Sequence, residues 1–224
     1  MSTTGQWVVG AVPDAEVAAL PGRFAHLPGE WRMPPGYAET LRWWLSGGDR
    51  EPFFTLDPDD PQTLLATPAA RRFAEFTDSG GPSAPAVDAM REASLELVGV
   101  GAGVRGVVEG DGLFVAEARG ASPAAALWYG LGAEAAARLP GWFGDFLLSA
   151  EEVRGVLPQV EEVLGVSGHR RTEVLVRVEA WVSGMGGEVG AAGFRAGELL
   201  EGPVRVLRYA AGVGAGAVGV TRRG

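Results

Sequence analysis

The chain has 224 residues and a formal net charge of −9, with 46% hydrophobic and 21% charged residues. A chain of this length and composition is typical of a globular protein that buries a substantial core. The acidic net charge argues against nucleic acid as a partner, because phosphates bind to basic surfaces. The lack of cysteine excludes disulfides, thiolate metal sites and cysteine nucleophiles.

The first residues carry no positively charged leader, and no apolar run reaches the roughly 18 residues of a membrane span. We therefore expect a cytoplasmic protein without membrane insertion. All 19 basic residues are arginine, and lysine, isoleucine and asparagine are absent. Because the codons of these three residues are rich in A and T, the composition indicates a GC-rich bacterial genome, in which glycine, alanine, valine and arginine are weak structural signals.

In the first third of the chain, residues 6–12 (QWVVGAV) predict a strand, and a short helix is expected over 13–20. The apolar spacing over 37–46 predicts a helix, and Thr67-Pro68 begins another, since threonine caps helices and proline favours their first turn. The Gly-, Ser- and Pro-rich loop 77–86 is the best candidate for a linker.

Three strands at 95–100, 104–108 and 113–118 are expected to form an antiparallel meander, because Glu-Gly-Asp-Gly between the last two indicates a tight turn. Ser122-Pro123 caps a helix that should reach Leu139. Ser149 and Glu152 have the spacing of a capping box at the start of a further helix.

Residues 170–183 fit both a helical and a strand period, and we favour the helix. A closing hairpin is predicted over 204–222, from VRVLRY and AVGVTR. The clustering of strands predicts an α+β fold with an antiparallel sheet packed by several helices. It forms a single domain over 1–224, or two halves separated by the loop 77–86.

The motif G-x-G-x-x-G, which binds pyrophosphate in dinucleotide-binding proteins, occurs twice, beginning at Gly101 and at Gly214. Neither copy is followed by the required helix, and 35 glycines in the chain make chance matches expected, so we predict no cofactor. Residues 99–108 and 212–221 agree at seven of ten positions. They are glycine-rich turns or the trace of an internal duplication.

Candidate chemistry is sparse. The two histidines, His26 and His169, are too few for a zinc site, so no metal is expected. Either is a weak candidate for a general base, but no partner is visible in the sequence. The aspartates of LDPDDPQ lack the glycine and glutamate of a calcium loop and are interpreted as turn residues. Whether the protein is an enzyme stays open, with the missing catalytic motifs favouring a non-catalytic role.

The seven tryptophans are many for this length. Three lie on apolar helical stripes and are expected in the core. The other four include Trp31, Trp43 and Trp142, which lie in or beside loops or off the buried face. We predict that these three form a binding surface, because aromatic residues are enriched in interfaces and ligand clefts. The alternative is that they fold over the core.

The run LELVGVGAGVRGVVEGDGLFVAEARGASPAAALWYGLGAEAAARLPG, residues 95–141, resembles the cytosolic chaperones associated with type VII (ESX) secretion. The resemblance implies two quasi-symmetric sheet-plus-helix halves and non-catalytic binding of a secreted protein. The segment WRMPPGYAETLRWWL and the C-terminal glycine-rich stretch depart from that family, and no binding residue carries over.

The resulting hypothesis is a protein-binding protein, a chaperone or adaptor for another protein. The alternative is a small-molecule enzyme or ligand-binding protein, whose cleft would combine tryptophans, a histidine and carboxylates such as Asp111, Glu117 or Asp145. A small antagonist of the immunity type also suits the acidity.

Overall fold

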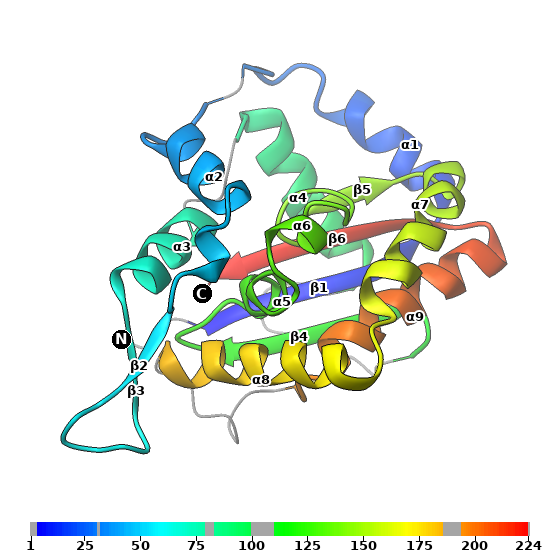
Figure 1. Cartoon of the computed structure of the whole chain (residues 1–224). Coiled ribbons are helices and arrows are strands. Elements are labelled where there is room, and N and C mark those ends of the chain that lie inside the picture. Colours follow the sequence, from blue (N-terminus) through cyan, green and yellow to red (C-terminus); the bar gives the residue numbers. More distant parts are fainter. Residues whose placement is uncertain (1–3, 31, 79–82, 100–109, 186–193, 224) are drawn as a thin grey trace.

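The first and last strands of the chain pair with each other at the centre of a four-stranded antiparallel sheet (Figure 1). The computed structural model describes residues 4–30, 32–78, 83–99, 110–185 and 194–223. The sheet order is β4–β1–β6–β5, and its strands are β1 (Thr4–Val12), β4 (Leu113–Arg119), β5 (Phe146–Leu148) and β6 (Gly216–Arg223). The expected α+β fold with an antiparallel sheet is confirmed.

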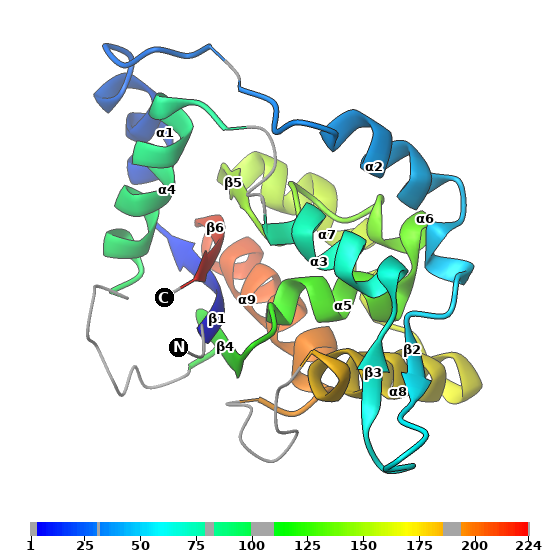
Figure 2. The same cartoon turned by 90° about the vertical axis from the view of Figure 1, so that its left-hand side faces the viewer.

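Helices cover both faces of this sheet, which explains why β1 is almost continuously apolar (Figure 2). One face carries the main core, with Trp7 and Val9 of β1 and Phe114 of β4. The elements on that side are α5 (Pro123–Leu131), α6 (Ala133–Ala136), α7 (Ala150–Leu164), α8 (Gly168–Gly184) and α9 (Glu198–Val213). Of these, α9, α5 and α7 contact the sheet directly; α7 also packs on α9, and α8 packs on α5.

The opposite face is covered by α1 (Asp14–Arg23) and α4 (Pro85–Leu97). Here Val8 of β1 and Val220 of β6 pack against Leu95 of α4, and Val12 packs with Val17 of α1. Side chains of successive strand residues point to opposite faces, so one strand serves two cores.

The remaining elements complete the main core. They are α2 (Tyr37–Leu45), the 3₁₀ helix η1 (Gly48–Arg50), β2 (Phe54–Leu56), β3 (Leu64–Ala66) and α3 (Pro68–Asp78). To this core α2 contributes Trp44 and α3 contributes Phe73. Strands β2 and β3 form a separate hairpin that projects from the body (Figures 1 and 2).

The two ends of the predicted loop 77–86 are helical, since α3 reaches Asp78 and α4 begins at Pro85. Phe53 and Phe73, which precede this segment, pack with Tyr129 and Trp181, which follow it, so both sides share one core.

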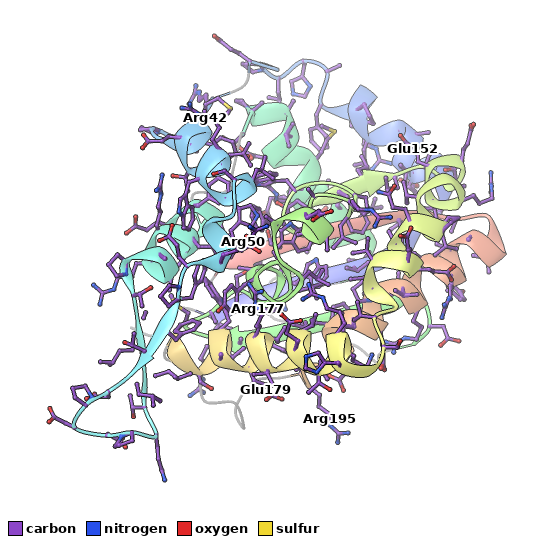
Figure 3. All side chains as sticks on the ribbon, viewed as in Figure 1. Arg42, Arg50, Glu152, Arg177, Glu179 and Arg195 are labelled. Atoms are coloured by element: carbon purple, nitrogen blue, oxygen red, sulfur yellow. The ribbon has the colours of Figure 1, made fainter. Side chains whose placement is uncertain are left out.

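An arginine closes the contact between α8 and η1. Arg177 projects from α8 into the body of the protein, whereas Glu179 and Arg195 point outward (Figure 3). The Arg177 guanidinium donates to the carbonyl oxygen of Asp49 at 3.2 Å and lies 4.5 Å from the ring centre of Tyr129. A cation over an aromatic face is attracted by the ring quadrupole, so this side chain joins α8, α5 and η1.

Several helix predictions are confirmed. A helix begins at Pro68 after Thr67, and the capping box of Ser149 and Glu152 forms at the start of α7. The ambiguous segment 170–183 lies in α8, which buries Val174, Val178, Trp181 and Val182 on one face. The helix expected to reach Leu139 is instead interrupted at Gly132, whose positive φ of 84° ends α5 before the short helix α6.

Two strand predictions are wrong. Residues 204–209 belong to α9, so no hairpin forms over 204–222; only the strand at 217–222 exists, as part of β6. The buried residues of α9 recur at helical spacing over a longer stretch than VRVLRY, and Gly214 ends the helix in the left-handed conformation. Residues 95–97 lie in α4 rather than in a meander strand, and β4, which confirms the strand at 113–118, pairs with β1.

The strand expected at 104–108 lies outside the described residues, as does most of the first glycine-rich repeat at 99–108. The second repeat spans the end of α9 and most of β6. The internal duplication therefore stays a prediction. Within the ranges that the structure describes, no helix is both long and apolar enough to cross a membrane.

We expect Gly202→Ala in α9 to lower the free energy of unfolding by about 1–3 kcal/mol, because the new Cβ would overlap the ring of Phe114 in a packed core. Gly155→Ala in α7 is the matched control. Nothing lies within 4 Å of a Cβ at position 155, so the free energy of unfolding should rise by about 0.5–1 kcal/mol, because alanine favours the helix over glycine. Urea unfolding of both variants checks the opposite signs; equal effects would contradict the close contact of α9 with β4.

Candidate functional site

A tight turn between α6 and β5 places one carboxylate against the sheet. Residues 142–145 form a two-residue hairpin turn, in which the amides of Trp142 and Asp145 donate to each other's carbonyl oxygens at 2.9 and 2.8 Å. Phe143 and Gly144 both have positive φ, 44° and 92°, as in a type I′ turn. Asp145 follows directly and leads into β5.

The conformation of Phe143 is strained, because a bulky residue rarely adopts positive φ. The surrounding core holds it in place. The Phe143 ring is 5% exposed and makes contacts with Phe73, Phe76, Trp128 and Trp142. The turn is tied to the sheet as well, since the indole nitrogen of Trp7 donates to the carbonyl oxygen of Gly144 at 3.2 Å. The position of Asp145 is therefore determined by packing on both sides of the turn.

Asp145 connects three elements of the fold. Its Oδ1 accepts hydrogen bonds from the amide of Thr221 at 2.6 Å and from its hydroxyl at 2.9 Å. Its Oδ2 pairs with the guanidinium of Arg91 in α4 at 2.8 Å. Arg91 pairs in turn with Asp88, one helical turn earlier, at 3.2 Å. The Asp145 side chain is only 18% exposed. Burial raises the pKa of Asp145, while Arg91 and the Thr221 hydrogen bonds oppose that shift.

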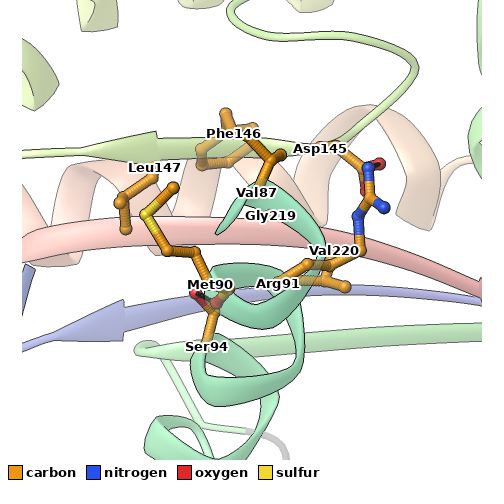
Figure 4. A pocket seen from close by; sticks show the side chains of 9 residues that line it. All are labelled: Val87, Met90, Arg91, Ser94, Asp145, Phe146, Leu147, Gly219 and Val220. Atoms are coloured by element: carbon orange, nitrogen blue, oxygen red, sulfur yellow. Dashed lines mark hydrogen bonds and ion pairs between the residues drawn. The ribbon is translucent and has the colours of Figure 1, made fainter. Parts of the chain in front are cut away.

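A hollow of about 140 Å³ lies beside this ion pair, between α4 and the edge of the sheet (Figure 4). We call it the α4 hollow. Its lining comes from one face of α4, from β5 with the preceding residue, and from β6; the residues are Val87, Met90, Arg91, Ser94, Asp145, Phe146, Leu147, Gly219 and Val220. Most of the lining is apolar, and the charged groups stand at one end.

The polar side chains in the described lining of the α4 hollow are those of Arg91, Ser94 and Asp145. The hydroxyl of Ser94 donates to the carbonyl oxygen of Met90 at 2.7 Å, within its own helix, and no histidine lines the site. A serine nucleophile requires an adjacent base, which the described lining does not supply. Among the residues that the structure describes, no group of three or more histidine and acidic side chains is placed to hold a metal ion.

The two histidines are not brought together. His26 follows α1 and His169 lies in the first turn of α8, and both are exposed. Neither lines the α4 hollow. Of the three carboxylates suggested by the sequence, Asp111 and Glu117 are exposed, and only Asp145 is held in a defined site.

The predicted tryptophan surface is only partly visible, because Trp31 lies outside the described residues. Trp43 and Trp142 are half-buried and lie in different clusters. Trp43 stacks on Phe53, donates to Glu51 at 2.6 Å and lies under the guanidinium of Arg72. Trp142 packs against Tyr37, Phe76 and Phe143.

Sequence reasoning missed Arg91 and Thr221, which give Asp145 its environment. The sequence does contain a weak signal at Asp145 itself, since the glycines of GWFGDF indicate a turn that fixes its position. No comparable signal marks its partners, which lie 54 and 76 residues away.

Comparison with protein-family models, with curated proteins and with solved structures found no match to this chain.

Asp145 generates a prediction about pH. Because burial raises its pKa in the folded state, Asp145 binds a proton more tightly in the folded than in the unfolded protein. The stability that this difference contributes is complete below the unfolded pKa of about 3.9 and is lost as pH rises through the folded pKa. The free energy of unfolding of the wild type minus that of Asp145→Asn should therefore fall as pH rises from about 3.5. Denaturant unfolding at several pH values measures this difference.

The matched control is Glu152→Gln. Hydrogen bonds from Ser149 lower the pKa of Glu152, so its contribution is present above the unfolded pKa and lost as pH falls. The corresponding difference should rise with pH. If the Asp145 difference also rose, attraction by Arg91 would outweigh burial and the assignment would be wrong.

Proposed function

We propose that this protein binds another protein through the hairpin of β2 and β3, residues 54–66. The observation that carries the proposal is the exposure of its apolar side chains. Leu56 is 62% exposed and Leu65 is 42% exposed, on a hairpin that projects from the body. The register pairs Leu56 with Leu64 and Leu65 with Thr55, so the two leucines lie on opposite faces of the hairpin. Single apolar residues are common on surfaces, but two large ones exposed on one projecting element suit a partner that grips the hairpin from both faces.

The base of the hairpin is anchored in the main core. Phe53 is 1% exposed and stacks on Tyr129 with 4.5 Å between ring centres. Phe54 contacts both Tyr129 and Trp181 edge-on. The amide of Thr67 donates to the carbonyl oxygen of Phe53 at 2.9 Å and closes the base. An isolated two-stranded hairpin is marginally stable in water, so this anchoring is what supports the projection.

The tip of the hairpin is ordered by its own aspartates. The carboxylate of Asp57 accepts from the amide of Asp59 at 2.9 Å, and Asp60 accepts from the amide of Gln62 and the hydroxyl of Thr63 at 3.2 and 2.7 Å. The interpretation of these residues as turn residues is thus supported by their hydrogen bonds. A preorganised loop loses less conformational entropy on binding than a flexible one.

The charge of the hairpin defines the chemistry of the partner. Residues 54–66 contain three aspartates and no basic side chain. Hydrogen bonds from Thr63 and Gln62 lower the pKa of Asp60, so this carboxylate is charged at neutral pH. Exposed leucines beside fixed negative charge fit an apolar surface bordered by arginine or lysine, and the net charge of −9 would steer such a partner towards the protein.

The role of chaperone or adaptor is the narrower part of the proposal. It is supported by the resemblance of residues 95–141 to type VII secretion chaperones, whereas the hairpin supports protein binding in general.

A photo-cross-linking amino acid placed at position 56 or 65 tests the proposal in native cell lysate. We expect a defined adduct from both positions and none from position 213, where an equally exposed valine (59%) lies at the end of α9. Mass spectrometry of the adduct should locate the cross-link at an apolar residue flanked by basic ones.

The purified partner then gives a quantitative test. Leu56→Ser with Leu65→Ser should weaken binding at least about tenfold, because truncating buried anchor residues typically costs more than 1 kcal/mol each. Val213→Ser should leave the dissociation constant unchanged. The proposal is overturned if the double leucine variant binds the partner as tightly as Val213→Ser does. It is also overturned if the cross-linked adduct is a second copy of this chain rather than a different protein.

A further inference from the structure

We propose that the α4 hollow is a binding site for a small neutral molecule, with an apolar body of about one ring and a hydroxyl or amide group at the Arg91–Asp145 end. This inference is independent of the hairpin. The hollow lies on the α4 side of the sheet, whereas the hairpin is anchored in the main core on the opposite side (Figure 2).

The shape of the hollow follows from the way α4 lies on the sheet. Val87, Met90, Arg91 and Ser94 share one helical face, at the spacing i, i+3, i+4 and i+7. The next turn of the same helix packs directly, with Leu95 against Val8 and Val220. A volume of about 140 Å³ is close to that of the apolar cavity of about 150 Å³ that holds benzene in another protein.

The apolar lining selects the body of the ligand. Val87, Leu147 and Val220 are aliphatic and Met90 is flexible, whereas the ring of Phe146 packs against the main core on the other face of the sheet. A thioether adapts to irregular shapes and makes favourable contacts with aromatic rings. The hydroxyl of Ser94 is directed to the backbone of its own helix and does not make this part of the hollow polar.

The polar end selects the head group. Asp145 receives three hydrogen bonds, and a carboxylate has about four acceptor positions. The guanidinium of Arg91 donates to Asp88 and Asp145, which leaves donors available among its five N–H groups. A hydroxyl both donates and accepts, so it can hydrogen-bond to the remaining positions of both side chains.

Charge disfavours ionised ligands. Arg91 is paired with Asp88 at 3.2 Å and with Asp145 at 2.8 Å, so one positive group stands between two negative ones. Of these three groups, only Arg91 and Asp145 line the hollow, and they neutralise each other. An ionised head group would lose hydration there without meeting an unpaired opposite charge, whereas a neutral hydroxyl or amide avoids that cost.

A matched series with the same ring tests the assignment, using benzyl alcohol, benzylamine and benzoate. The protein is labelled with ¹³C at the methionine methyl groups, and the Met90 signal is followed by NMR. We expect benzyl alcohol to give a saturable shift with a dissociation constant on the order of 1 mM, as suits a ligand of about eight non-hydrogen atoms. Benzylamine should bind more weakly, and benzoate should give no saturable shift.

Val87→Phe should abolish the benzyl alcohol shift by filling the hollow, while Val176→Phe, at a 57% exposed position of α8, is the control. Intermolecular NOEs from the ring protons to the methyl groups of Met90 and Val220 in the wild type locate the ligand even if Val87→Phe fails to fold. The inference is overturned if benzyl alcohol gives no saturable shift or no such NOEs, or if benzoate binds as tightly. Binding at the hairpin should be unaffected by filling the hollow, so the two proposals fail separately.

Discussion

The structure depends first on the antiparallel pairing of β1 with β6, which joins the two ends of the described chain at the centre of the sheet. The other two strands of this sheet extend it on either side of the pair, and the helices pack on the two faces of the sheet. β1 also pairs with β4, and β6 also pairs with β5, so the sheet extends outward from its two terminal strands. Because the alternating side chains of β1 contribute to both cores, a change of register would move Trp7 and Val8 to the wrong faces.

Asp145 reinforces this arrangement from the edge of the sheet. It accepts from the backbone and hydroxyl of Thr221 in β6 and pairs with Arg91 in α4, so one carboxylate holds the last strand, the turn before β5 and the covering helix together. The same ion pair stands at the polar end of the α4 hollow. A buried ion pair contributes little net stability, because the cost of desolvating both charges offsets their attraction. The Arg91–Asp145 pair therefore serves mainly to fix the position of α4 on the sheet.

The two proposed sites use different physical features on opposite sides of the sheet. The hairpin presents exposed leucines and fixed aspartates to solvent, which suits a large partner with a complementary surface. The α4 hollow is a small depression with a single polar end, which suits a molecule of about one ring. The predicted tryptophan surface contributes to neither in the described residues, because Trp43 and Trp142 are packed among other aromatic rings.

The sequence by itself determined the α+β class, the strand at 6–12 and the helix starts at Thr67, Ser122 and Ser149, because capping and periodicity act between residues at most a few positions apart. The tertiary structure alone decided the helical state of residues 204–209 and 95–97, whose short apolar patterns fit either conformation until a neighbouring face buries them. It alone also decided the environment of Asp145 and the exposure of Leu56 and Leu65. The environment of Asp145 arises from contacts across 54 and 76 residues. The exposure of the two leucines, which lie on opposite faces of the hairpin, arises because the hairpin projects beyond the core that anchors Phe54. Neither property leaves a local pattern in the chain.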